Sequence, residues 1–551
     1  MLLSNLDLLA TAPGGVARLR ELILTLAVQG KLVPQDPADE PASRLLLKIR
    51  AEKDRLMAEG KIKRDKPLAE IAEDEKPFEL PMGWAFCRLG DLLLSIRSGG
   101  TPSKQNPAYW NGDIPWASVK DLGFGEPLTD TQDRITKEGL EAGSQLAGAG
   151  SILICTRMGL GKIGEALIDV AINQDLKAVQ LGAGVNKQYF VNYFKTLSVV
   201  GSGMTVAGIK QEELLGFVVP LPPEAEQSRI VTRVEELMRL CDALEAKGQL
   251  EAAQHSQLVS TLLGTLTASA TPEELAENWQ RVAQHFDLLL DRPQAIDALE
   301  QTLLQLAVRG LLVPQDPTDE PASVLLQKIR AEKDRLITEG KIKRDKPLPP
   351  IADEEKPFEL PVGWEWVRVG SIGVTQTGGT PASSNPQYFD GNFPFIGPGQ
   401  ITPMGKILSP EKFISEAGRL ESAVAEPGDI LMVCIGGSIG KCAAVPFATA
   451  FNQQINSIHP LLAFSEFVLI AMTATDFVSA VVSTATGSAT PIISKGKWDL
   501  LLLPLPPLPE QSRIVTRVTA LRRLCADLRQ RLAERQSVQA RLAEALVAEV
   551  A

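Results

Sequence analysis

The stretch LVPQDPADEPASRLLLKIRAEKDRLMAEGKIKRDKPL at 32–68 returns as LVPQDPTDEPASVLLQKIRAEKDRLITEGKIKRDKPL at 312–348. The copies differ at only five of 37 positions, which are 38, 44, 47, 57 and 58 in the first copy. EKPFELPMGW at 75–84 likewise returns as EKPFELPVGW, and PLPPEAEQSRIVTRV at 220–234 as PLPPLPEQSRIVTRV at 504–518. The period of 280 residues is far longer than the about 20–50 residues of solenoid repeats, so the pattern indicates a duplicated scaffold.

The sequence between the repeated segments diverges. SGGTPSKQNPAYWNGDIPW at 98–116 faces TGGTPASSNPQYFDGNFPF at 377–395, and the remainder shares less. We call 32–84 with 220–234 the first frame and 312–364 with 504–518 the second frame. The divergent stretches 85–219 and 365–503 are called module 1 and module 2. This pattern predicts two recognition modules on matching supports, each module free to recognise something different.

Composition limits the class of protein. The chain has 551 residues, of which 44% are hydrophobic and 22% charged, as in soluble multidomain proteins. Its net charge of −11 argues against a protein that holds nucleic acid by bulk electrostatics alone. Neither the six cysteines nor the three histidines are spaced as metal ligands, so we expect free thiols. We also expect a cytoplasmic protein with no membrane partner, because no signal peptide or membrane-spanning run is evident.

The segments after the PLPP motifs carry a helical period. An apolar stripe in the second copy includes Ile514, Val518, Leu521, Cys525, Leu528, Leu532, Leu542 and Leu546, interrupted at Arg535 and Gln539. The first copy repeats it at Ile230, Val234, Leu237, Cys241 and Leu244, breaks at Gly248, Glu251 and His255, and resumes at Leu258 and Leu262. This spacing predicts two coiled-coil-like helices, each of ~40 residues and about 60 Å, packed antiparallel with a module at either end.

Shorter helices are expected in each frame. The segments that begin at Ser43 and Ser323 and end at Gly60 and Gly340 have helical composition. LRELILTLAVQG at 19–30 resembles LEQTLLQLAVRG at 299–310, so we expect it to complete the first helical frame. The KIKRDK runs at 61–66 and 341–346 could contact phosphate or form a solvated or partner-facing surface. Short Val/Ile/Leu runs within the modules predict mixed sheets with few helices.

GLGKIG at 159–164 formally matches the G-x-G-x-x-G pattern of dinucleotide-binding turns. The second copy keeps a strand, a glycine turn and one lysine but loses the pattern, and neither turn is followed by the expected helix and acid. The Walker pattern also fails, because glycine is missing at Thr156 and Ile435. We therefore interpret this segment as a tight strand connection rather than a phosphate cradle.

Several features occur twice and in order: frames that end in PLPPxxEQSRIV, a GGTP opening of each module, a strand with a glycine-lysine turn, and Asn-Gln downstream. Together they resemble the specificity (S) subunits of type I restriction-modification systems over nearly the whole chain. The resemblance implies an α+β fold in which long antiparallel coiled-coil-like helices separate two mixed α/β target recognition domains, with a tandem repeat of about 280 residues and pseudo-twofold symmetry. The chain departs from the commoner layout of the family, because about 83 residues precede Trp84.

The resemblance implies that each domain reads one half of a split double-stranded DNA sequence. The helices would set the spacer and dock two methyltransferase subunits, and motor-nuclease subunits would join that core. We find no methyltransferase, Walker or nuclease motif in the chain and expect a non-catalytic subunit without its own cofactor. S-adenosylmethionine, ATP and magnesium would then belong to the partner subunits.

These considerations predict six segments. They are an N-terminal helical frame segment at 1–83, target recognition domain 1 at 84–223, a central helical region at 224–310, a repeated helical frame segment at 311–363, target recognition domain 2 at 364–507 and a C-terminal helix at 508–551.

Base edges are read by side chains with directional donors and acceptors, which selects the candidates. In the first domain they are Thr101, Ser103, Lys104, Ser118, Lys120, Arg157, Lys162, Asn173, Gln174 and Lys210. In the second they are Thr380, Ser383, Ser384, Gln400, Ser438, Lys441, Asn452, Gln453, Lys495 and Lys497. An alternative for the Asn-Gln pairs is that they bond their own backbone.

Module charge suggests how DNA would be held. Module 1 carries 12 Lys/Arg against 13 Asp/Glu, and module 2 carries 7 against 10. We therefore expect much of the phosphate contact to come from partner subunits. Two other functions stay open on the sequence alone: a protein-binding coiled-coil scaffold that reads no DNA, and a nucleotide-dependent enzyme.

Overall fold

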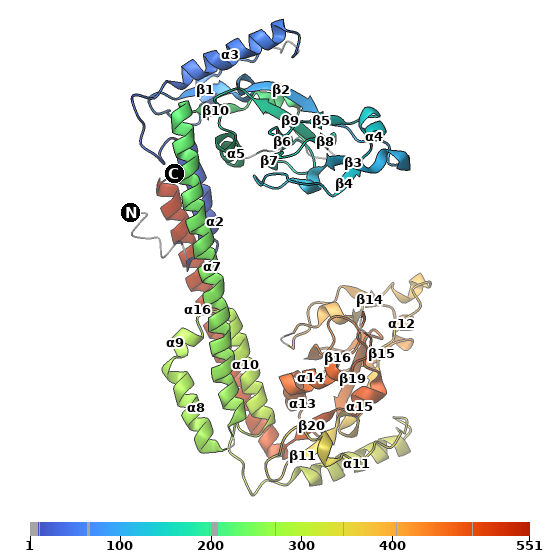
Figure 1. The fold of residues 1–551 in the computed structure, drawn as a ribbon. Helices are drawn as coiled ribbons and strands as arrows, with labels where there is room; N and C mark the ends of the chain where they lie inside the picture. Colours follow the sequence, from blue (N-terminus) through green and yellow to red (C-terminus); the bar gives the residue numbers. More distant parts are fainter. Residues whose placement is uncertain are drawn as a thin grey trace. The chain divides into compact units, whose positions relative to one another are not determined.

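The computed structural model describes residues 9, 11–62, 67–197, 199, 208–269, 271–344, 346–403, 405–487 and 489–550. The chain divides into two compact units. Unit 1 contains Met1–Leu250 with Gln536–Ala551, and unit 2 contains Glu251–Arg535 (Figure 1). Of the KIKRDK runs, residues 63–66 and 345 lie outside the described residues.

The described residues of module 1 form three small sheets. Their strand orders are β1-β10, β2-β9-β6-β7 and β4-β3-β8-β5. Most pairs are antiparallel, but β3 and β8 run parallel. The strands are β1 (Ala85–Arg88), β2 (Leu93–Ser98), β3 (Trp110–Ala117), β4 (Asp133–Ile135), β5 (Gln145–Ala147), β6 (Ile152–Cys155), β7 (Ile163–Glu165), β8 (Val170–Ile172), β9 (Leu176–Leu181) and β10 (Val218–Leu221).

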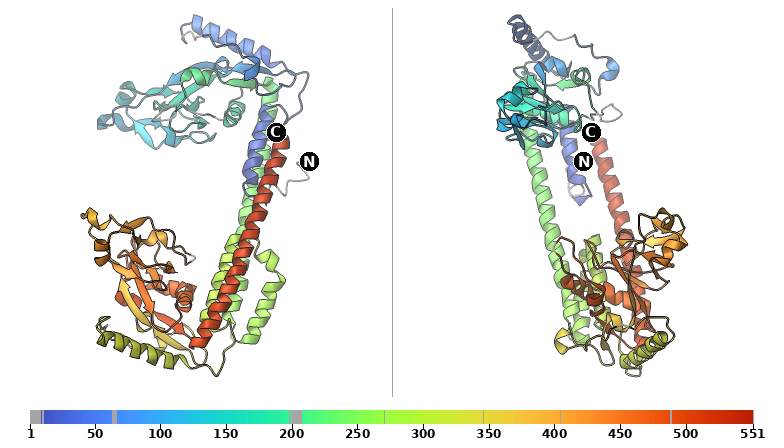
Figure 2. Two further views of the ribbon diagram at one scale, coloured as in Figure 1. Left: turned by 180° about the vertical axis from the view of Figure 1, so that it is seen from behind. Right: turned by 90° about the vertical axis from the view of Figure 1, so that its right-hand side faces the viewer.

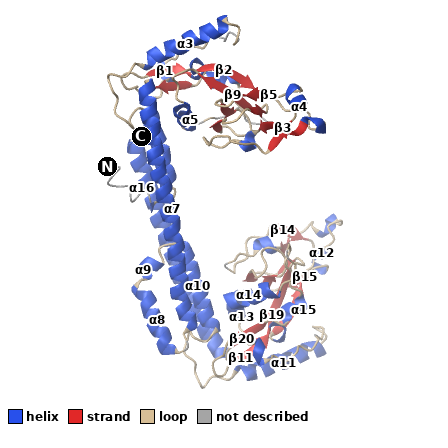
Figure 3. Ribbon diagram, viewed as in Figure 1, coloured by secondary structure: helices blue, strands red, loops and turns tan. Residues whose placement is uncertain are grey.

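Module 2 repeats this topology strand for strand, as β11-β20, β12-β19-β16-β17 and β14-β13-β18-β15. The strands of both modules are drawn in red in Figure 3. The strands are β11 (Glu365–Arg368), β12 (Gly373–Thr377), β13 (Phe393–Ile396), β14 (Lys412–Ile414), β15 (Ala423–Ala425), β16 (Ile430–Val433), β17 (Cys442–Ala444), β18 (Thr449–Phe451), β19 (Ile455–Pro460) and β20 (Leu502–Leu505). Mixed sheets were expected, and the prediction is confirmed. Two sequences that differ at most positions therefore adopt one backbone plan.

Helices supply the frames and cover the sheets. Those outside the modules are α2 (Gly15–Val28), α3 (Ala42–Ala58), α7 (Glu224–Ala268), α8 (Pro272–Gln284), α9 (Phe286–Leu289), α10 (Pro293–Val308), α11 (Ala322–Thr338) and α16 (Leu508–Val550). Those within the modules are α4 (Lys137–Glu141), α5 (Lys187–Lys195), α6 (Gln211–Leu215), α12 (Glu416–Leu420), α13 (Ser465–Thr473), α14 (Thr475–Thr484) and α15 (Lys495–Asp499). The long helices α7 and α16 have 45 and 43 residues, close to the expected length.

The short frame helices begin one residue earlier than predicted. α3 and α11 start at Ala42 and Ala322, not at the serines that follow. The Ala42 amide donates to the Gly83 carbonyl at 2.8 Å, and Ala322 donates to Gly363 at the same distance. A backbone carbonyl of the neighbouring turn therefore accepts from an amide that has no acceptor within the helix.

The apolar stripe of the long helices shifts by one position. The heptad pattern predicted burial of Leu258 and Leu542, but these side chains are 52% and 48% exposed. Their neighbours Val259 and Ala543 are buried instead, at 4% and 0% exposure. An α-helix has 3.6 residues per turn, so its buried line drifts away from a strict heptad after the polar interruption.

The helix α2 packs as expected from its likeness to 299–310. In unit 1 its Ile23, Leu24 and Ala27 share a core with Ile230 and Val234 of α7. Figure 2 shows the ribbon of α2 alongside α7. In unit 2, α10 packs in the same way, with Leu304, Ala307 and Val308 in the core that holds Ile514 and Val518 of α16. Each long helix therefore begins against a shorter helix that precedes its own frame.

A buried glutamate joins the separate segments of each frame. Glu226, in the first turn of α7, is 1% exposed and accepts hydrogen bonds from the indole Nε1 of Trp84 at 3.0 Å and from Gln35 Nε2 at 3.2 Å. Burial raises the pKa of Glu226, and these hydrogen bonds oppose the shift. Glu510 repeats the arrangement with Trp364 at 2.9 Å and Gln315 at 3.2 Å.

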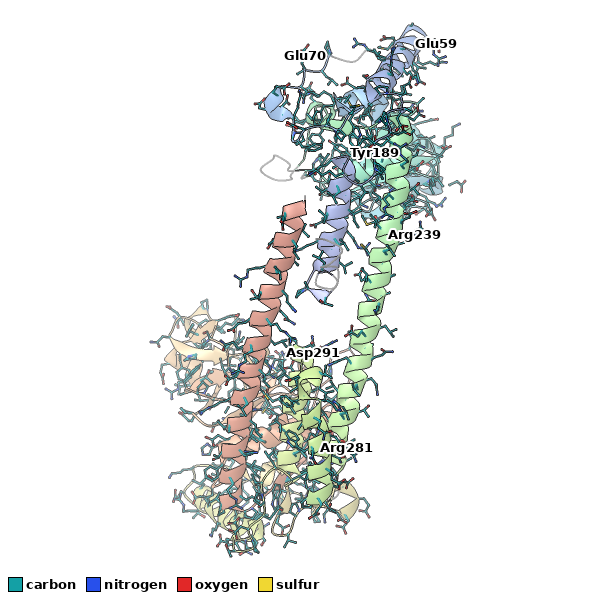
Figure 4. The ribbon with its side chains drawn as sticks, turned by 90° about the vertical axis from the view of Figure 1, so that its left-hand side faces the viewer. Glu59, Glu70, Tyr189, Arg239, Arg281 and Asp291 are labelled. Carbon is teal, nitrogen blue, oxygen red and sulfur yellow. The ribbon has the colours of Figure 1, made fainter. Side chains whose placement is uncertain are left out.

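Gln227, the next residue of the EQSRIV motif, and Trp84 join the first frame to module 1. Gln227 is fully buried, accepts from the Asn186 amide at 2.7 Å and donates to the Pro222 carbonyl at 3.2 Å. The Trp84 indole also meets Tyr189 of α5 edge-on, with ring centroids 6.5 Å apart. Tyr189 lies beside the first part of α7 in Figure 4. In unit 2, Gln511 and Trp364 make the matching contacts, with the Phe464 amide and the Phe467 ring.

Within the described residues, no single helix is long and apolar enough to cross a membrane. The bent pair α13 and α14 passes the same test only when its two helices are taken together.

Replacing Glu226 with alanine leaves the indole N–H of Trp84 buried without an acceptor and removes one of the acceptors of Gln35 Nε2. We expect Glu226→Ala to lower the free energy of unfolding by about 2–4 kcal/mol, and Glu510→Ala to do the same. Denaturant unfolding of the full chain measures this. Glu235→Ala, on the exposed side of the same helix, should change stability by less than about 0.5 kcal/mol. Equal small effects for Glu226 and Glu235 would contradict the structural role.

Candidate nucleic-acid interface

In module 1, four loops converge where the strands β2, β3, β6 and β8 end. β3 and β8 end side by side at Ala117 and Ile172, and the Asn173 amide donates to the Ala117 carbonyl at 3.0 Å. The loop after β6 joins them, because the Thr156 amide donates to the Asp175 carbonyl at 2.8 Å. The GGT segment packs on the same edge, with the Gly100 amide 2.9 Å from the Ile172 carbonyl. We call loops 99–101, 118–121, 156–162 and 173–175 loop cluster 1.

The Asn-Gln pair divides into two roles. Asn173 is buried, accepts from the Asp175 amide at 3.0 Å and donates to the Asp175 carboxylate at 3.1 Å. It therefore bonds its own loop, which was the alternative prediction for this residue. Gln174 is exposed and accepts a hydrogen bond from the Thr101 hydroxyl. The GGT and Asn-Gln segments thus present one Thr–Gln pair to solvent.

Several predicted contact residues of this cluster already have protein partners. Lys162 Nζ donates to the Val119 carbonyl at 2.9 Å, and the Ser118 hydroxyl donates to Asp121 at 2.9 Å. Lys120 pairs with Asp133 at 2.9 Å, and the hydrogen bond to that carboxylate raises the pKa of Lys120. Arg157 is half-exposed and lies 3.6 Å from the buried Asp175 carboxylate. Arg157 is therefore loosely paired, whereas Lys162 fixes the fold of two loops.

Module 2 builds the same cluster from different side chains. The Asn452 amide donates to the Ile396 carbonyl at 3.1 Å, and the Cys434 amide donates to the Gln454 carbonyl at 2.7 Å. Asn452 again closes its own loop, accepting from the Gln454 amide at 3.1 Å. The Thr380 hydroxyl donates to exposed Gln453 at 2.5 Å. We call loops 378–380, 397–400, 434–441 and 452–454 loop cluster 2.

Some of the other candidates in module 2 already have protein partners, and others are exposed to solvent. Gln400 Oε1 caps its own turn by accepting from the Gly397 amide at 3.0 Å, and the Ser438 carbonyl accepts from the Lys441 amide at 3.2 Å. Lys495 pairs with Asp499 along α15 at 2.7 Å. Ser383, Ser384 and Lys497 are exposed.

The remaining candidates of module 1 lie on segments that flank loop cluster 1. Lys210 is exposed and follows Ile209, whose amide donates to the Thr156 carbonyl at 3.0 Å. Ser103 and Lys104 are exposed in the segment between Thr101 and β3, and the Ser103 carbonyl accepts from the Trp110 indole at 3.1 Å. The ten candidates of module 1 therefore divide into residues of loop cluster 1 and residues on these flanking segments.

Met158 is a further candidate residue of loop cluster 1 that the sequence analysis missed. Met158 adopts a left-handed backbone conformation with φ of 60° and is 69% exposed at the tip of loop 156–162. A non-glycine residue in this region is uncommon and costs conformational energy. The neighbouring glycines in RMGLG, which indicate a tight turn, are the sequence signal that could have identified Met158.

The glycine motif itself is a strand connection. β6 and β7 pair antiparallel, with Ile154 opposite Ile163, and Gly161 has φ of +87° in the turn between them. The turn thus leads into a strand, whereas a dinucleotide cradle opens a helix. No group of His, Cys, Asp and Glu that could hold a metal ion occurs in the described part of the chain.

Comparison with known proteins identifies the family. A model described as "Type I restriction modification DNA specificity domain" matches residues 81–254 and again 361–535. The chain belongs to this specificity family. The chain is 37% identical over 562 residues to the Type I restriction enzyme EcoAI specificity subunit of Escherichia coli. This alignment covers 97% of the chain and 93% of that relative.

Two further relatives give the range of similarity. The Type I restriction enzyme EcoEI specificity subunit of Escherichia coli is 42% identical over 384 residues, covering 68% of this chain and 64% of the relative. Among solved structures, a chain from "Structural basis underlying complex assembly and conformational transition of the type I R-M system" gives a TM-score of 0.48 at 19% identity, covering 86% of this chain and 99% of that one.

The first glycine of each GGT loop, Gly99 or Gly378, is required by the close approach of a neighbouring backbone carbonyl. A Cβ on Gly378 would lie 2.0 Å from the Asn452 carbonyl oxygen, whereas one on Gly399 in the same module would meet nothing within 4 Å. We expect Gly378→Ala to separate the two loops and lower the unfolding free energy by about 1–3 kcal/mol. Gly399→Ala should stay within about 0.5 kcal/mol of the parent. Thermal unfolding compares them, and an undisturbed Gly378→Ala would show that the loops do not pack this closely.

Proposed function

We propose that this specificity subunit selects the DNA target of a type I restriction-modification complex through its two loop clusters, each of which reads one half of a bipartite sequence. The supporting observation is that loop clusters 1 and 2 share one backbone plan and differ in side chains. A common backbone would place each module in the same way on DNA, and different side chains would select different bases.

Within each cluster, the exposed polar groups are the proposed base readers. The Thr101–Gln174 and Thr380–Gln453 pairs expose amide and hydroxyl groups at matching places, and amide side chains recognise base edges by paired hydrogen bonds. Arg157 of loop cluster 1 corresponds to Ile435 of loop cluster 2 when the two copies are aligned, so the two clusters also differ in charge. The other predicted contact residues stay proposals of the same kind, with Lys120, Lys162 and Lys495 already engaged by protein groups.

We also propose a division of the chain into domains. Residues 84–223 and 364–507 would be the target recognition domains, and 1–83 and 311–363 the frame segments. The regions 224–310 and 508–551 would contain an antiparallel pair of long helices that sets the spacer. Pseudo-twofold symmetry of the two copies would match the twofold symmetry of the DNA backbone.

Partner subunits would supply catalysis and most of the phosphate contact. Two methyltransferase subunits would dock on the long helices, motor-nuclease subunits would join them, and S-adenosylmethionine, ATP and magnesium would be held by these partners in the cytoplasm. Matched exposed leucines support docking on the helices. Leu240 and Leu524 are 60% and 59% exposed at equivalent positions of α7 and α16, and Leu258 and Leu542 follow 18 residues later, which is five helical turns.

Single substitutions should change one half of the target at a time. Arg157→Ala should relax base choice in one half only, by about 1–3 kcal/mol of discrimination at the contacted position. Lys441→Ala should affect only the other half. Sequencing of methylated bases in DNA from cells with the subunit and its methyltransferase reads both halves at once.

Matched controls are available in each module. Arg134→Ala removes an exposed cation paired with Asp130 in module 1, and Arg419→Ala removes a half-buried cation paired with Glu416 in module 2. Both should leave the methylated sequence unchanged. A complex that is assembled but methylates no split sequence would overturn the proposed function.

Shortening the helices should change the spacer and not the half-sites. Two heptads removed from α7 and from the equivalent part of α16 shorten each helix by about 21 Å, which corresponds to about 6 base pairs of B-DNA at about 3.4 Å each. The same methylation sequencing measures the gap. Altered half-sites with an unchanged gap would contradict the spacer role.

A further inference from the structure

Each frame contains a tight turn with an exposed apolar residue at its apex. In Pro81-Met82-Gly83-Trp84 the Trp84 amide donates to the Pro81 carbonyl at 3.2 Å, and Gly83 has φ of +85°. This geometry is a type II turn, which requires glycine at its third position. The turn at 361–364 repeats it, with a hydrogen bond of 3.1 Å and φ of +88° at Gly363.

The apex residue differs between the copies but stays apolar. Met82 is 83% exposed and Val362 is 98% exposed. This is the single position at which EKPFELPMGW and EKPFELPVGW differ. Isolated exposed apolar residues are common on proteins, but here two different side chains keep the same character at the same apex. Packing within the chain does not account for this, because neither side chain is buried.

The turn is fixed by contacts with the two helices of its frame, α3 and α7. The Gly83 carbonyl accepts from the first amide of α3 at 2.8 Å, and Trp84 is anchored on Glu226. A Cβ on Gly83 would lie 3.4 Å from Pro223, which directly precedes α7. In unit 2, Gly363 approaches Pro507 in the same way, at 3.7 Å. Such an apex loses little conformational freedom when it binds a partner.

We propose that Met82 and Val362 are matched anchors that each insert into an apolar socket on one copy of the methyltransferase subunit. The proposal rests on the proposed function, which places two copies of that subunit on α7 and α16. Each apex lies at the N-terminal end of one of these helices, which expose Leu240 and Leu524 further along. Two equivalent anchors suit one partner that binds twice.

The chemistry of the apex favours protein over DNA. DNA contacts outside the base edges are made by cations and hydrogen-bond donors to phosphate. The turn segment Pro-Met-Gly-Trp or Pro-Val-Gly-Trp offers an apolar side chain at its apex, and its indole donor is already used by a buried glutamate. Burial of this side chain in an apolar pocket of a partner protein would have a favourable free energy, because apolar surface is removed from water.

The test uses the full chain co-expressed with its methyltransferase subunit. Met82→Asp and Val362→Asp are made singly and together, and native mass spectrometry counts methyltransferase copies over a concentration series. Each single variant should weaken one of the two sites about 10-fold or more and populate a complex with one copy. The double variant should weaken both sites. Leu288→Asp, at a 72% exposed position of α9, is the control and should keep two copies.

Additional variants separate anchoring from folding. Met82→Leu and Val362→Leu retain an apolar apex and should retain both copies, and unfolding temperatures should match the parent for every variant. Two copies bound with parental affinity in the double Asp variant would overturn the proposal. Loss of only DNA binding, or of only the motor-nuclease subunit, would overturn it as well. Methylation sequencing of the parent complex tests the proposed function separately: a split target in the parent with no effect of the apex variants rejects the anchors alone.

Discussion

The hydrogen bonds that Trp84 and Gln35 donate to the buried carboxylate of Glu226 are the constraint on which each half of this structure depends. They join three segments that are distant in the chain: the LVPQDP loop, the turn before the module and the first turn of the long helix. A carboxylate removed from water needs such donors, and the indole and amide groups supply them. Because the same residues recur at Glu510, both modules begin and end on the frame in the same way.

These fixed ends explain how the modules can diverge. The strand order is identical in both copies, and the same backbone contacts bring the loops together at Ala117 and Ile396. Residues that hold loops together are repeated, as with Asn173 and Asn452, whereas some of their neighbours are exchanged, as with Arg157 and Ile435. A protein that must recognise two unlike targets with one architecture would divide its residues in this way.

Much of this organisation could be predicted from sequence, because repetition and helical period are local signals. The lengths of α7 and α16, the mixed sheets and the strand connection at GLGKIG all follow from such patterns. The exposure of Leu258 and Leu542 could not be predicted by heptad counting, since the burial line depends on helical drift across a polar interruption. The starts of α3 and α11 depend on a carbonyl about 40 residues away in sequence, at Gly83 or Gly363. Sequence alone also offered no means to distinguish Lys162, which bonds a neighbouring loop, from the exposed Gln174.

Near-identity of the two frames also has a consequence for how the chain folds. Gln35 and Trp84 must find Glu226 across separations of 191 and 142 residues, so closing a frame carries a loop-closure cost that collapse of the intervening module reduces. Until the frame closes, Glu510 offers an equivalent acceptor to the same donors, either within the chain or from a second molecule. The local energy of the exchanged pairing is nearly the same, so chain connectivity must favour the correct partner. Domain-swapped dimers are the characteristic misfolded product of such a duplication.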